Sequence, residues 1–362
     1  MLLNSKYINT PAAILNNNYI ITQVIQMSMT VMPDSYAGPN FNNKIRILFR
    51  SAGFDPLFVF SALQRPMIEN QWSINLPDIP AEKWKQPNFR LVIHAQDFVN
   101  WYKNTLCKEL FWLEKQFTYE QQRKIIFLHW DHGLRNTYEG HIECVEFASH
   151  SYELVHQLQD RWEEWKAVHN KDIKYNWICL NGRPKFHRNR LFQILQNQPT
   201  GFVTHGLHNP APMSPYFKNY GWNNVNNFID LMPLYQQSKT SIVGETIYAD
   251  HPGIISEKTL LAVAAKHPFM CIGHIGIHSE IAERGFENFH ELFDLSYDTV
   301  EQELRIDAAM ESNLPNLLNP DWDIEHAQEK AERNFDFLMS DYTKTIEQRA
   351  QRQLVEIMKK SY

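Results

Sequence analysis

Glycine is scarce in this chain, and its scarcity argues against several kinds of protein. Only 13 of the 362 residues are glycine, which disfavours a collagen, a glycine-rich linker and a nucleotide site built on a glycine fingerprint. An excess of basic charge is also missing, since the formal net charge is −6. A strongly basic surface is the first sign of a nucleic-acid binder, so the total charge disfavours that function and leaves room only for a local basic groove.

Long apolar runs and paired cysteines are missing as well. No apolar run reaches the ~18 residues of a membrane-spanning helix, and three asparagines at residues 16–18 interrupt the apolar start of the chain. No basic segment leads into an unbroken apolar one, so we expect no signal peptide and a cytoplasmic location. No C-x-x-C pair occurs, so the cysteines are expected to be reduced thiols. They are Cys107, Cys144, Cys179 and Cys271.

Aromatic residues and histidine, by contrast, are abundant. The chain has 22 Phe, 15 Tyr, 10 Trp and 16 His, so both core packing and stacking on a ligand have to be considered. Hydrophobic residues make up 43% of the chain and charged residues 21%, a balance typical of a globular protein. At ~150 residues a domain, the length predicts about two domains.

Short apolar segments alternate with longer segments of helical periodicity in the first half. We expect strands at Lys44–Arg50, Phe89–His94 and Lys124–Trp130, and helices at Phe98–Glu114 and Phe147–Val168. Strands that alternate with helices form parallel sheets covered by helices. The pattern therefore predicts an α/β fold.

The second half repeats this alternation and ends in a charged helical segment at 324–360. Ser256 is expected to cap a helix, and Gly285 to end one. Two α/β blocks are therefore predicted, meeting near residue 180. The expected strands are Tyr175–Leu180, Gly201–Thr204, Ser241–Thr246 and Phe269–Ile272, and the expected helices are Arg188–Leu195, Glu257–Lys266 and Ser279–Arg284.

A basic segment follows the expected strand at 175–180 and opens a helix. It carries Arg183, Lys185, His187 and Arg188 within six residues. A strand end that leads into a helix N-terminus is where α/β proteins hold anionic ligands, and arginine is suited to bidentate phosphate contacts. The segment is therefore a candidate phosphate site, with a solvated basic loop as the alternative.

Two further segments could contact the same ligand. Ser256 is followed by Glu257 and Lys258, and a lysine in the first turn opposes the helix dipole unless an anion lies there. Residues 273–276 (Gly-His-Ile-Gly) follow an apolar strand directly, so their glycines would let the backbone approach a ligand closely. An ordinary capping segment and an ordinary turn are the alternatives.

Taken in order, these segments and their neighbours resemble one family. The stretch from Tyr175 to about Asp298, about a third of the chain, is similar to the donor-binding half of GT-B-fold glycosyltransferases. These occur in bacterial and viral sequences and are distantly similar to fucosyltransferases. Residues 1–170 match only in layout. The motifs are Asn-Gly-Arg-Pro-x-x-His-Arg from Asn181, Val-Gly-Glu-Thr from Val243, Ile-Ser-Glu-Lys-Thr from Ile255, Pro-Phe-x-x-x-Gly from Pro268, Arg-Gly-Phe-x-x-Phe from Arg284 and Phe-Asp-x-Ser-Tyr-Asp from Phe293.

The resemblance implies a fold and a division of labour. The fold would be two Rossmann-like α/β domains facing a cleft, followed by a helical C-terminal tail. The domains would be an acceptor-side domain at 1–174, a nucleotide-sugar-binding domain at 175–320 and a helical segment at 321–362. The donor would be a UDP- or GDP-linked sugar that serves as co-substrate, with no further cofactor and no metal.

The resemblance also implies donor contacts at particular residues. The diphosphate would contact Arg183, Arg188 and Lys258, and the ribose would contact Glu257. Gly182 stands where the family commonly has an arginine, so one phosphate contact would be absent. Glu245 would support the sugar or ribose. The segments themselves add His187, Ser256, Gly273 and His274 as candidate donor-site residues.

Transfer to a hydroxyl with inversion needs a general base, which is expected at a strand end in the first domain. Asp97 is the first choice, Asp131 and His132 are the second, and Asp55, expected after the first strand, is the third. Each could instead be a loop residue, and a retaining enzyme would need no such base. The acceptor would be a glycan in preference to a DNA base, which would require base flipping and a basic groove.

Two other functions fit parts of the sequence. A zinc-dependent hydrolase could use His129, Asp131 and His132, although Phe127 stands where a first ligand would be needed. The pair His205 and His208 could add ligands. A non-catalytic carbohydrate-binding protein would stack its aromatic side chains on sugar rings, and the basic segments would then have no role in binding.

Asp321-Trp322-Asp323 spells the D-x-D sequence that binds metal in the other large glycosyltransferase fold. It lies in a segment with helices and no expected strand. Carboxylates at a helix start explain it better, because they complement the helix dipole.

Overall fold

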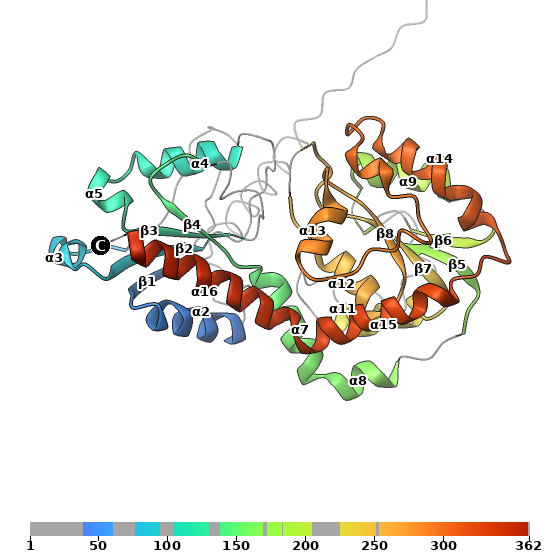
Figure 1. Cartoon of the computed structure of the whole chain (residues 1–362), viewed down its shortest axis with the longest axis horizontal. Helices are drawn as coiled ribbons and strands as arrows, with labels where there is room; N and C mark the ends of the chain where they lie inside the picture. The colour runs from blue at the N-terminus through green and yellow to red at the C-terminus, as the bar shows by residue number, and fades with distance from the viewer. Residues whose placement is uncertain are drawn as a thin grey trace, which may run out of the picture. The chain divides into compact units, whose positions relative to one another are not determined.

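Two parallel β-sheets organise the chain (Figure 1). The computed structural model describes residues 39–60, 77–94, 105–129, 138–168, 172–182, 184–204, 225–250 and 253–360. The strand orders are β1-β2-β3-β4 and β6-β5-β7-β8, and every neighbouring pair is parallel. The predicted α/β class, with two Rossmann-like parts and a helical tail, is confirmed.

The two inner strands of the first sheet are buried, and they are nearly continuous apolar runs, as parallel strands covered on both faces require. All six residues of β2 are buried, as are all five of β3. Its strands are β1 (Asp55–Phe60), β2 (Phe89–His94), β3 (Ile125–His129) and β4 (Glu143–Glu146). The helices of this half are α2 (Pro39–Ser51), α3 (Ala81–Lys85), α4 (Thr105–Glu114), α5 (Tyr119–Gln122), α7 (Ser149–Asp160) and α8 (Trp162–Ala167).

Two predictions in the first half are wrong. The segment 44–50 lies in helix α2, because Phe41, Ile45, Leu48 and Phe49 form a buried stripe at helical spacing. The first strand is β1 instead, and Asp55 begins it rather than following a strand. Asp55 therefore lies at the amino edge of the sheet, opposite the edge where parallel sheets bind ligands, and pairs with Lys83.

The predicted helix at 147–168 is divided in two. Arg161 lies between α7 and α8 with φ −109° and ψ 30°, outside the helical region. Its guanidinium pairs with Glu164 three residues later.

The second sheet matches the predicted strands closely, and three of its strands are each followed directly by a helix. Helix α9 follows β5, α12 follows β7, and α13 follows β8, so three helix starts share the carboxyl edge of the sheet. The strands are β5 (Tyr175–Cys179), β6 (Gly201–Val203), β7 (Ser238–Gly244) and β8 (Phe269–Ile272). The helices are α9 (Phe186–Leu195), α11 (Val225–Tyr235), α12 (Glu257–Ala264) and α13 (Ile277–Glu283), with a short 3₁₀ turn, η3, at Ser296–Thr299.

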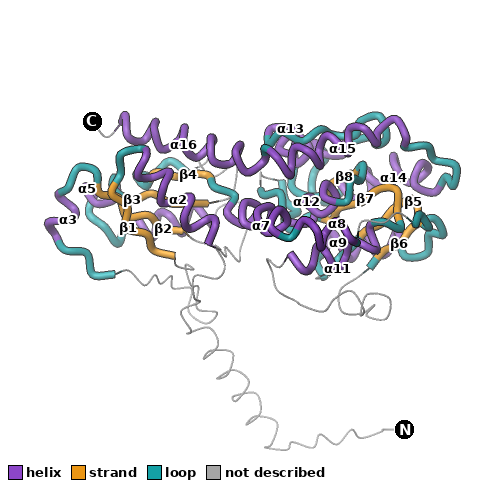
Figure 2. Tube along the Cα trace, turned by 90° about the horizontal axis from the view of Figure 1, so that it is seen from below, coloured by secondary structure: helices purple, strands orange, loops and turns teal. Residues whose placement is uncertain are grey.

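The chain beyond β8 is built of helices and loops, as predicted (Figure 2). The helices are α14 (Arg305–Leu318), α15 (Glu325–Ser340) and α16 (Tyr342–Lys360). Helix α15 packs on α12, whereas α16 packs on β4, α2 and α7. Residues 37–362 form a single unit, and the domain boundaries expected at residues 174 and 320 stay a prediction.

Burial decides the state of the cysteines whose side chains are described. Cys144, Cys179 and Cys271 are buried thiols outside any disulfide. Burial raises the pKa of Cys179 to about 12 and that of Cys271 well above its ordinary value. These thiols therefore pack as apolar groups, as expected. Within the described ranges, no helix combines the length and the apolar character needed to cross a membrane.

Candidate functional site

The recognised motifs come together at the carboxyl edge of the second sheet. Gly244, the last residue of β7, pairs with Ile272, the last of β8. The segments that follow these strands are therefore neighbours, and the segment after β5 joins them. This is the edge at which open parallel sheets bind ligands.

Glu245 ties the end of β7 to the start of α12. Its carboxylate is fully buried and accepts hydrogen bonds from the backbone amides of Thr246 (2.8 Å) and Ser256 (3.1 Å) and from the Thr259 hydroxyl (2.5 Å). A buried carboxylate with three donors is satisfied, and it fixes the geometry of the elements that supply them. The contact between Glu245 and a sugar or ribose stays a prediction.

Arg188 and His187 lie beneath the same strand end. The Arg188 guanidinium, on a side chain that is 3% exposed, donates to the carbonyl oxygens of Gly244 (3.2 Å) and Glu245 (2.9 Å). His187 Nε2 donates to the Glu245 carbonyl at 2.8 Å, and its ring stacks on Tyr248. Both side chains therefore hold the backbone that a ligand would approach.

The electrostatic environment at His187 is positive. Burial lowers the pKa of His187 to about 3, and the neighbouring charges of Arg188, Lys185 and Lys258 push it in the same direction. A titratable group reports the field of its surroundings through such a shift. His187 is thus neutral at physiological pH, and the cations around it mark a place that favours an anion.

Two lysines from different helix starts converge on Thr246. Lys185 Nζ donates to the Thr246 carbonyl oxygen at 2.6 Å, and Lys258 Nζ donates to the Thr246 hydroxyl at 3.2 Å. Both lysines and Thr246 are partly exposed. The arrangement presents two ammonium groups and a hydroxyl to a ligand at the sheet edge.

The start of α12 confirms the predicted cap. The Ser256 hydroxyl accepts from the Lys258 amide at 3.3 Å. Glu257 pairs with the Lys258 ammonium and lies 3.6 Å from His150 Nε2, which comes from α7. Burial alone would raise the pKa of Glu257, but Lys258 and His150 outweigh it and hold that pKa well below its ordinary value. Glu257 is therefore an anion, and its contact with a ribose stays a prediction.

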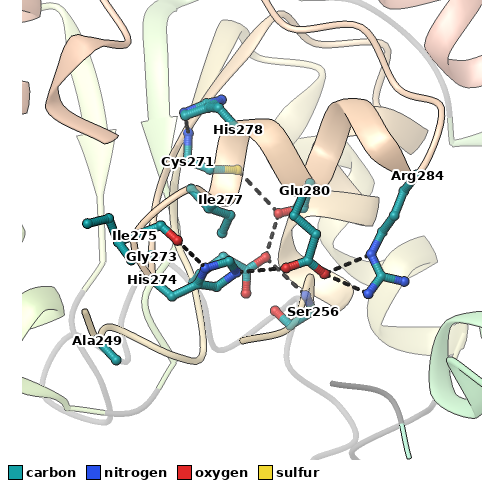
Figure 3. Close-up of polar contacts among 12 residues, drawn as sticks. Ala249, Ser256, Cys271, Gly273, His274, Ile275, Ile277, His278, Glu280 and Arg284 are labelled. Carbon is teal, nitrogen blue, oxygen red and sulfur yellow. Dashed lines mark hydrogen bonds and ion pairs between the residues drawn. The ribbon is translucent and has the colours of Figure 1, made fainter. Parts of the chain in front are cut away.

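Gly273 and His274 form the turn after β8 (Figure 3). His274 is 1% exposed, with Nε2 3.0 Å from Glu280 and Nδ1 2.9 Å from the carbonyl oxygen of Ile275. Both nitrogens of the ring are engaged with neighbours in the protein. Its expected contact with the donor stays a prediction. The ring is buried and contacts other residues of the protein.

Several predicted residues lie outside the described ranges. They are Asp97, Asp131, His132, Arg183, His205 and His208. The strands that precede the candidate bases are described: β2 ends at His94 and β3 at His129, so Asp97 and Asp131 follow strand ends in the chain as expected.

Two alternative metal sites were considered, the loop at residues 129–132 and the D-x-D sequence at 321–323, and parts of both are described. Among the described residues, no group of three or more His, Cys, Asp or Glu side chains could hold a metal ion. His129 is 1% exposed, and its ring stacks on Phe127. Asp323 accepts from the amide of Glu325, the first residue of α15, at 2.8 Å. This contact fits the helix-start explanation of the D-x-D sequence.

Sequence reasoning missed several contributors to the site. Thr246 and Thr259 close the Glu245 network, and His150 reaches Glu257 from the other half of the chain. Both threonines end a recognised motif, Val-Gly-Glu-Thr and Ile-Ser-Glu-Lys-Thr, which is the signal that could have found them. His150 carries no such signal, since it is 107 positions from its partner in the numbering (257 − 150).

Comparison with known proteins yields distant structural likeness only. No protein-family model and no curated protein matches the chain. The O-GlcNAc transferase of Thermobaculum terrenum is 11% identical, over 85% of this chain and 69% of that one, with a TM-score of 0.39. The wall teichoic acid polymerase TagF is 12% identical, over 84% of this chain and 73% of that one, with a TM-score of 0.29. With TM-scores this low, the likeness carries no argument for a shared activity.

Proposed function

We propose that the protein is a glycosyltransferase of GT-B type that moves a sugar from a nucleotide-sugar donor to a hydroxyl acceptor. The observation that carries this proposal is the convergence of Lys185 and Lys258 on Thr246 at the carboxyl edge of the second sheet. Two partly exposed lysines beside a helix start suit a diphosphate. The order of the motifs that supply them supports the same assignment.

In this proposal the second sheet stabilises the leaving diphosphate. Lys258, Lys185 and the start of α12 face the negative charge that develops as the glycosidic bond breaks, and Arg183 joins them. Arg188 acts indirectly: its buried guanidinium donates to the carbonyls of Gly244 and Glu245 and so positions the backbone at the end of β7. Charge stabilisation by side chains and a helix dipole needs no metal ion for the departure step.

The first sheet supplies the acceptor side. Asp97, three residues after the end of β2, accepts the hydroxyl proton in an inverting reaction, and Asp131 or His132 after β3 is the second choice. The donor is UDP- or GDP-linked. The acceptor is a glycan in preference to DNA, because the net charge of −6 disfavours a polyanion.

A thermal-shift screen of the full chain against nucleotide sugars and nucleoside diphosphates tests the proposal. A ligand at a hundredfold excess over its dissociation constant stabilises the folded state by ~2.7 kcal/mol, a readable shift. We expect a shift with UDP- or GDP-linked donors and a smaller one with the free sugars.

The control is Lys344→Ala, which removes an exposed lysine paired only three residues away in the chain. It should leave the ligand-induced shift unchanged. If no nucleotide sugar and no nucleoside diphosphate shifts the wild-type protein, the proposal is wrong.

A further inference from the structure

A chain of buried ionic contacts runs from the turn after β8 to the end of β4. Glu280 Oε1 accepts from Arg284 Nη2 at 2.6 Å and from Arg284 Nε at 2.8 Å. Arg284 also lies 3.4 Å from Glu146, which Arg349 of α16 contacts at 3.0 Å. His274 joins this series of contacts through Glu280, and it lies in the turn of the candidate site (Figure 3).

The partners of His274 fix its protonation state. Nδ1 faces the carbonyl oxygen of Ile275, which can only accept, so this nitrogen carries a proton. Nε2 lies 3.0 Å from Glu280 Oε2, an ion-pair contact outside hydrogen-bond geometry, and Arg284 helps to hold the pKa of that carboxylate below its ordinary value. The neighbouring carboxylate therefore favours the protonated ring, which donates from Nδ1 to Ile275 and forms an ion pair with Glu280.

The His274 ring lies directly against Gly253. A Cβ at Gly253 would fall 2.9 Å from His274 Cδ2 and 3.1 Å from Ile247 Cγ2, closer than side chains normally pack. Gly253 is the residue from which the chain enters the Ser256 cap. The ring thus packs against the first residue of the segment 253–256, which leads into the Ser256 cap.

The backbone of the same turn supports Glu245. A Cβ at Gly273 would fall 2.5 Å from Ile277 Cδ1 and 3.0 Å from Glu245 Cβ. Glu245 in turn holds the Ser256 amide and the Thr259 hydroxyl. The turn at 273–274 therefore contacts the start of α12 in two ways: through Gly253, and through Glu245, which holds Ser256 and Thr259.

We propose that His274 is a positioning residue of the anion site, which holds the segment 253–256 and through it the Ser256 cap and the Lys258 ammonium. The structural part of this inference stands on contacts within the protein. Its consequence for ligand affinity rests on the proposed function.

The inference gives the site a pH dependence of definite sign. Burial lowers the pKa of His274, but the hydrogen bond and charge of Glu280 outweigh it, so the net shift is upward. As pH rises through this raised pKa, the ring loses a proton and with it the ion pair with Glu280, and the segment 253–256 loosens. The charged and titratable groups on the elements around it are Glu280 and His278 of α13, Arg284 directly after that helix, Glu245 after β7, Cys271 of β8, Arg305 of α14, and Asp298 of η3.

Hydrogen exchange on the full chain without ligand tests the structural part. The Ser256 amide bonds to Glu245 and the Lys258 amide to the Ser256 hydroxyl, so exchange in the peptide 253–260 reports on the segment. His274→Gln should speed exchange there about tenfold relative to the wild type. His326→Gln, an exposed histidine on α15, is the matched control and should leave it unchanged.

Two further measurements keep the test decisive if His274→Gln folds poorly. Wild-type exchange in 253–260, corrected for the intrinsic effect of pH, should accelerate as pH rises through the His274 titration. Gly253→Ala, which pushes against the ring from the other side, should accelerate it at constant pH. Protection of 253–260 that changes with neither pH nor substitution overturns the inference.

Calorimetry with UDP and GDP then separates the inference from the proposed function. Wild-type affinity for either probe should fall about tenfold over the His274 titration, and His274→Gln should bind weakly at every pH. If neither probe binds the wild type, the proposed function fails while the exchange result still decides the positioning role. If Lys258→Ala abolishes binding but His274→Gln binds as the wild type does, the positioning role alone is wrong.

Discussion

The carboxyl edges of the two sheets differ in the exposure of their charged groups. In the first sheet, the last residues of β2, β3 and β4 are His94, His129 and Glu146, each 5% exposed or less. In the second sheet, β5, β7 and β8 end in cysteine, glycine and isoleucine. The second edge also has buried charged groups, Glu245 and Arg188, but it adds Lys185 and Lys258 at the helix starts, where they are partly exposed.

The difference shows which polar groups serve packing and which can serve a ligand. His94 Nε2 lies 3.1 Å from the Ser149 hydroxyl, and burial lowers the pKa of His94 to about 4. Such a group is neutral and committed to the interior. Lys185 and Lys258 are partly exposed at helix starts, so the second edge is the better anion site.

The sharpest way to separate the roles of the two edges is to remove the proposed base. Asp97→Asn should lower turnover about 10²- to 10⁴-fold, because a general base is worth that much, and should leave UDP and GDP affinity unchanged. Release of nucleoside diphosphate in the presence of a glycan acceptor measures the first effect, and calorimetry the second. Asp78→Asn, at an exposed position, is the control; equal turnover of Asp97→Asn and the wild type removes Asp97 from the role.

Arg284 is the point at which the two halves share buried charge. Arg284→Ala leaves Glu280 with a single partner and takes one from Glu146, and breaking a buried pair in this way costs ~3–5 kcal/mol of unfolding free energy. Urea unfolding measures the loss. Arg333→Ala breaks an exposed pair with Glu287 and should cost ~0–1 kcal/mol. Losses of equal size in the two variants would contradict the assignment of a buried network.

Lysines at the two sheets should differ in their effect on binding. Lys258→Ala should weaken UDP or GDP binding ~10- to 100-fold, the loss of one charge-assisted contact. Lys83→Ala, which breaks the pair with Asp55 at the amino edge of the first sheet, should leave affinity unchanged. Calorimetry measures the UDP and GDP affinity of both variants. An equal loss of affinity in Lys83→Ala would indicate a general charge effect and contradict a specific role for Lys258.

Counted per unit of pH, the effect expected on stability is the smallest of the four. His94 and His187 have lowered pKa values, about 4 and about 3. The unfolded chain therefore binds more protons below about pH 6.5, and each histidine should cost up to ~1.4 kcal/mol of stability per pH unit as pH falls toward its folded pKa. The raised pKa of His274 acts in the opposite direction, and its stabilisation is lost as pH rises.

Urea unfolding at a series of pH values measures these slopes. His94→Gln should flatten the acid side of the profile, and His326→Gln should not. An acid slope that His94→Gln leaves unchanged would mean that other groups set it.

Most of the fold could be predicted from the sequence because its strands are continuous apolar runs between turn signals. FRLVIH, YNWIC and FMCI are strands in the structure as predicted. The failure at 44–50 has a physical cause: alternation in Lys-Ile-Arg-Ile imitates a strand, whereas the helical stripe becomes visible only when the window starts at Pro39. Asp55 and Pro56 at the start of β1 concealed the true first strand.

The site could be predicted only as far as its residues are neighbours in the sequence. The Ser256 cap and the end of α13 at Gly285, where φ is +101°, follow from local chemistry. The convergence of Lys185 on Thr246 and the contact between His150 and Glu257 depend on pairing between distant elements. No periodicity or motif spacing encodes such contacts, because they arise only when the sheet assembles.

Helix α16 has a consequence for how this chain is made. It packs on β4 and α2, and its Arg349 contacts Glu146 across 203 positions of sequence. A ribosome adds ~5–20 residues per second, so roughly 10 to 40 s separate the synthesis of β4 from that of its covering helix. During that interval the nascent first sheet exposes the apolar surface that α16 later covers, and its solubility depends on whatever shields that surface in the cell.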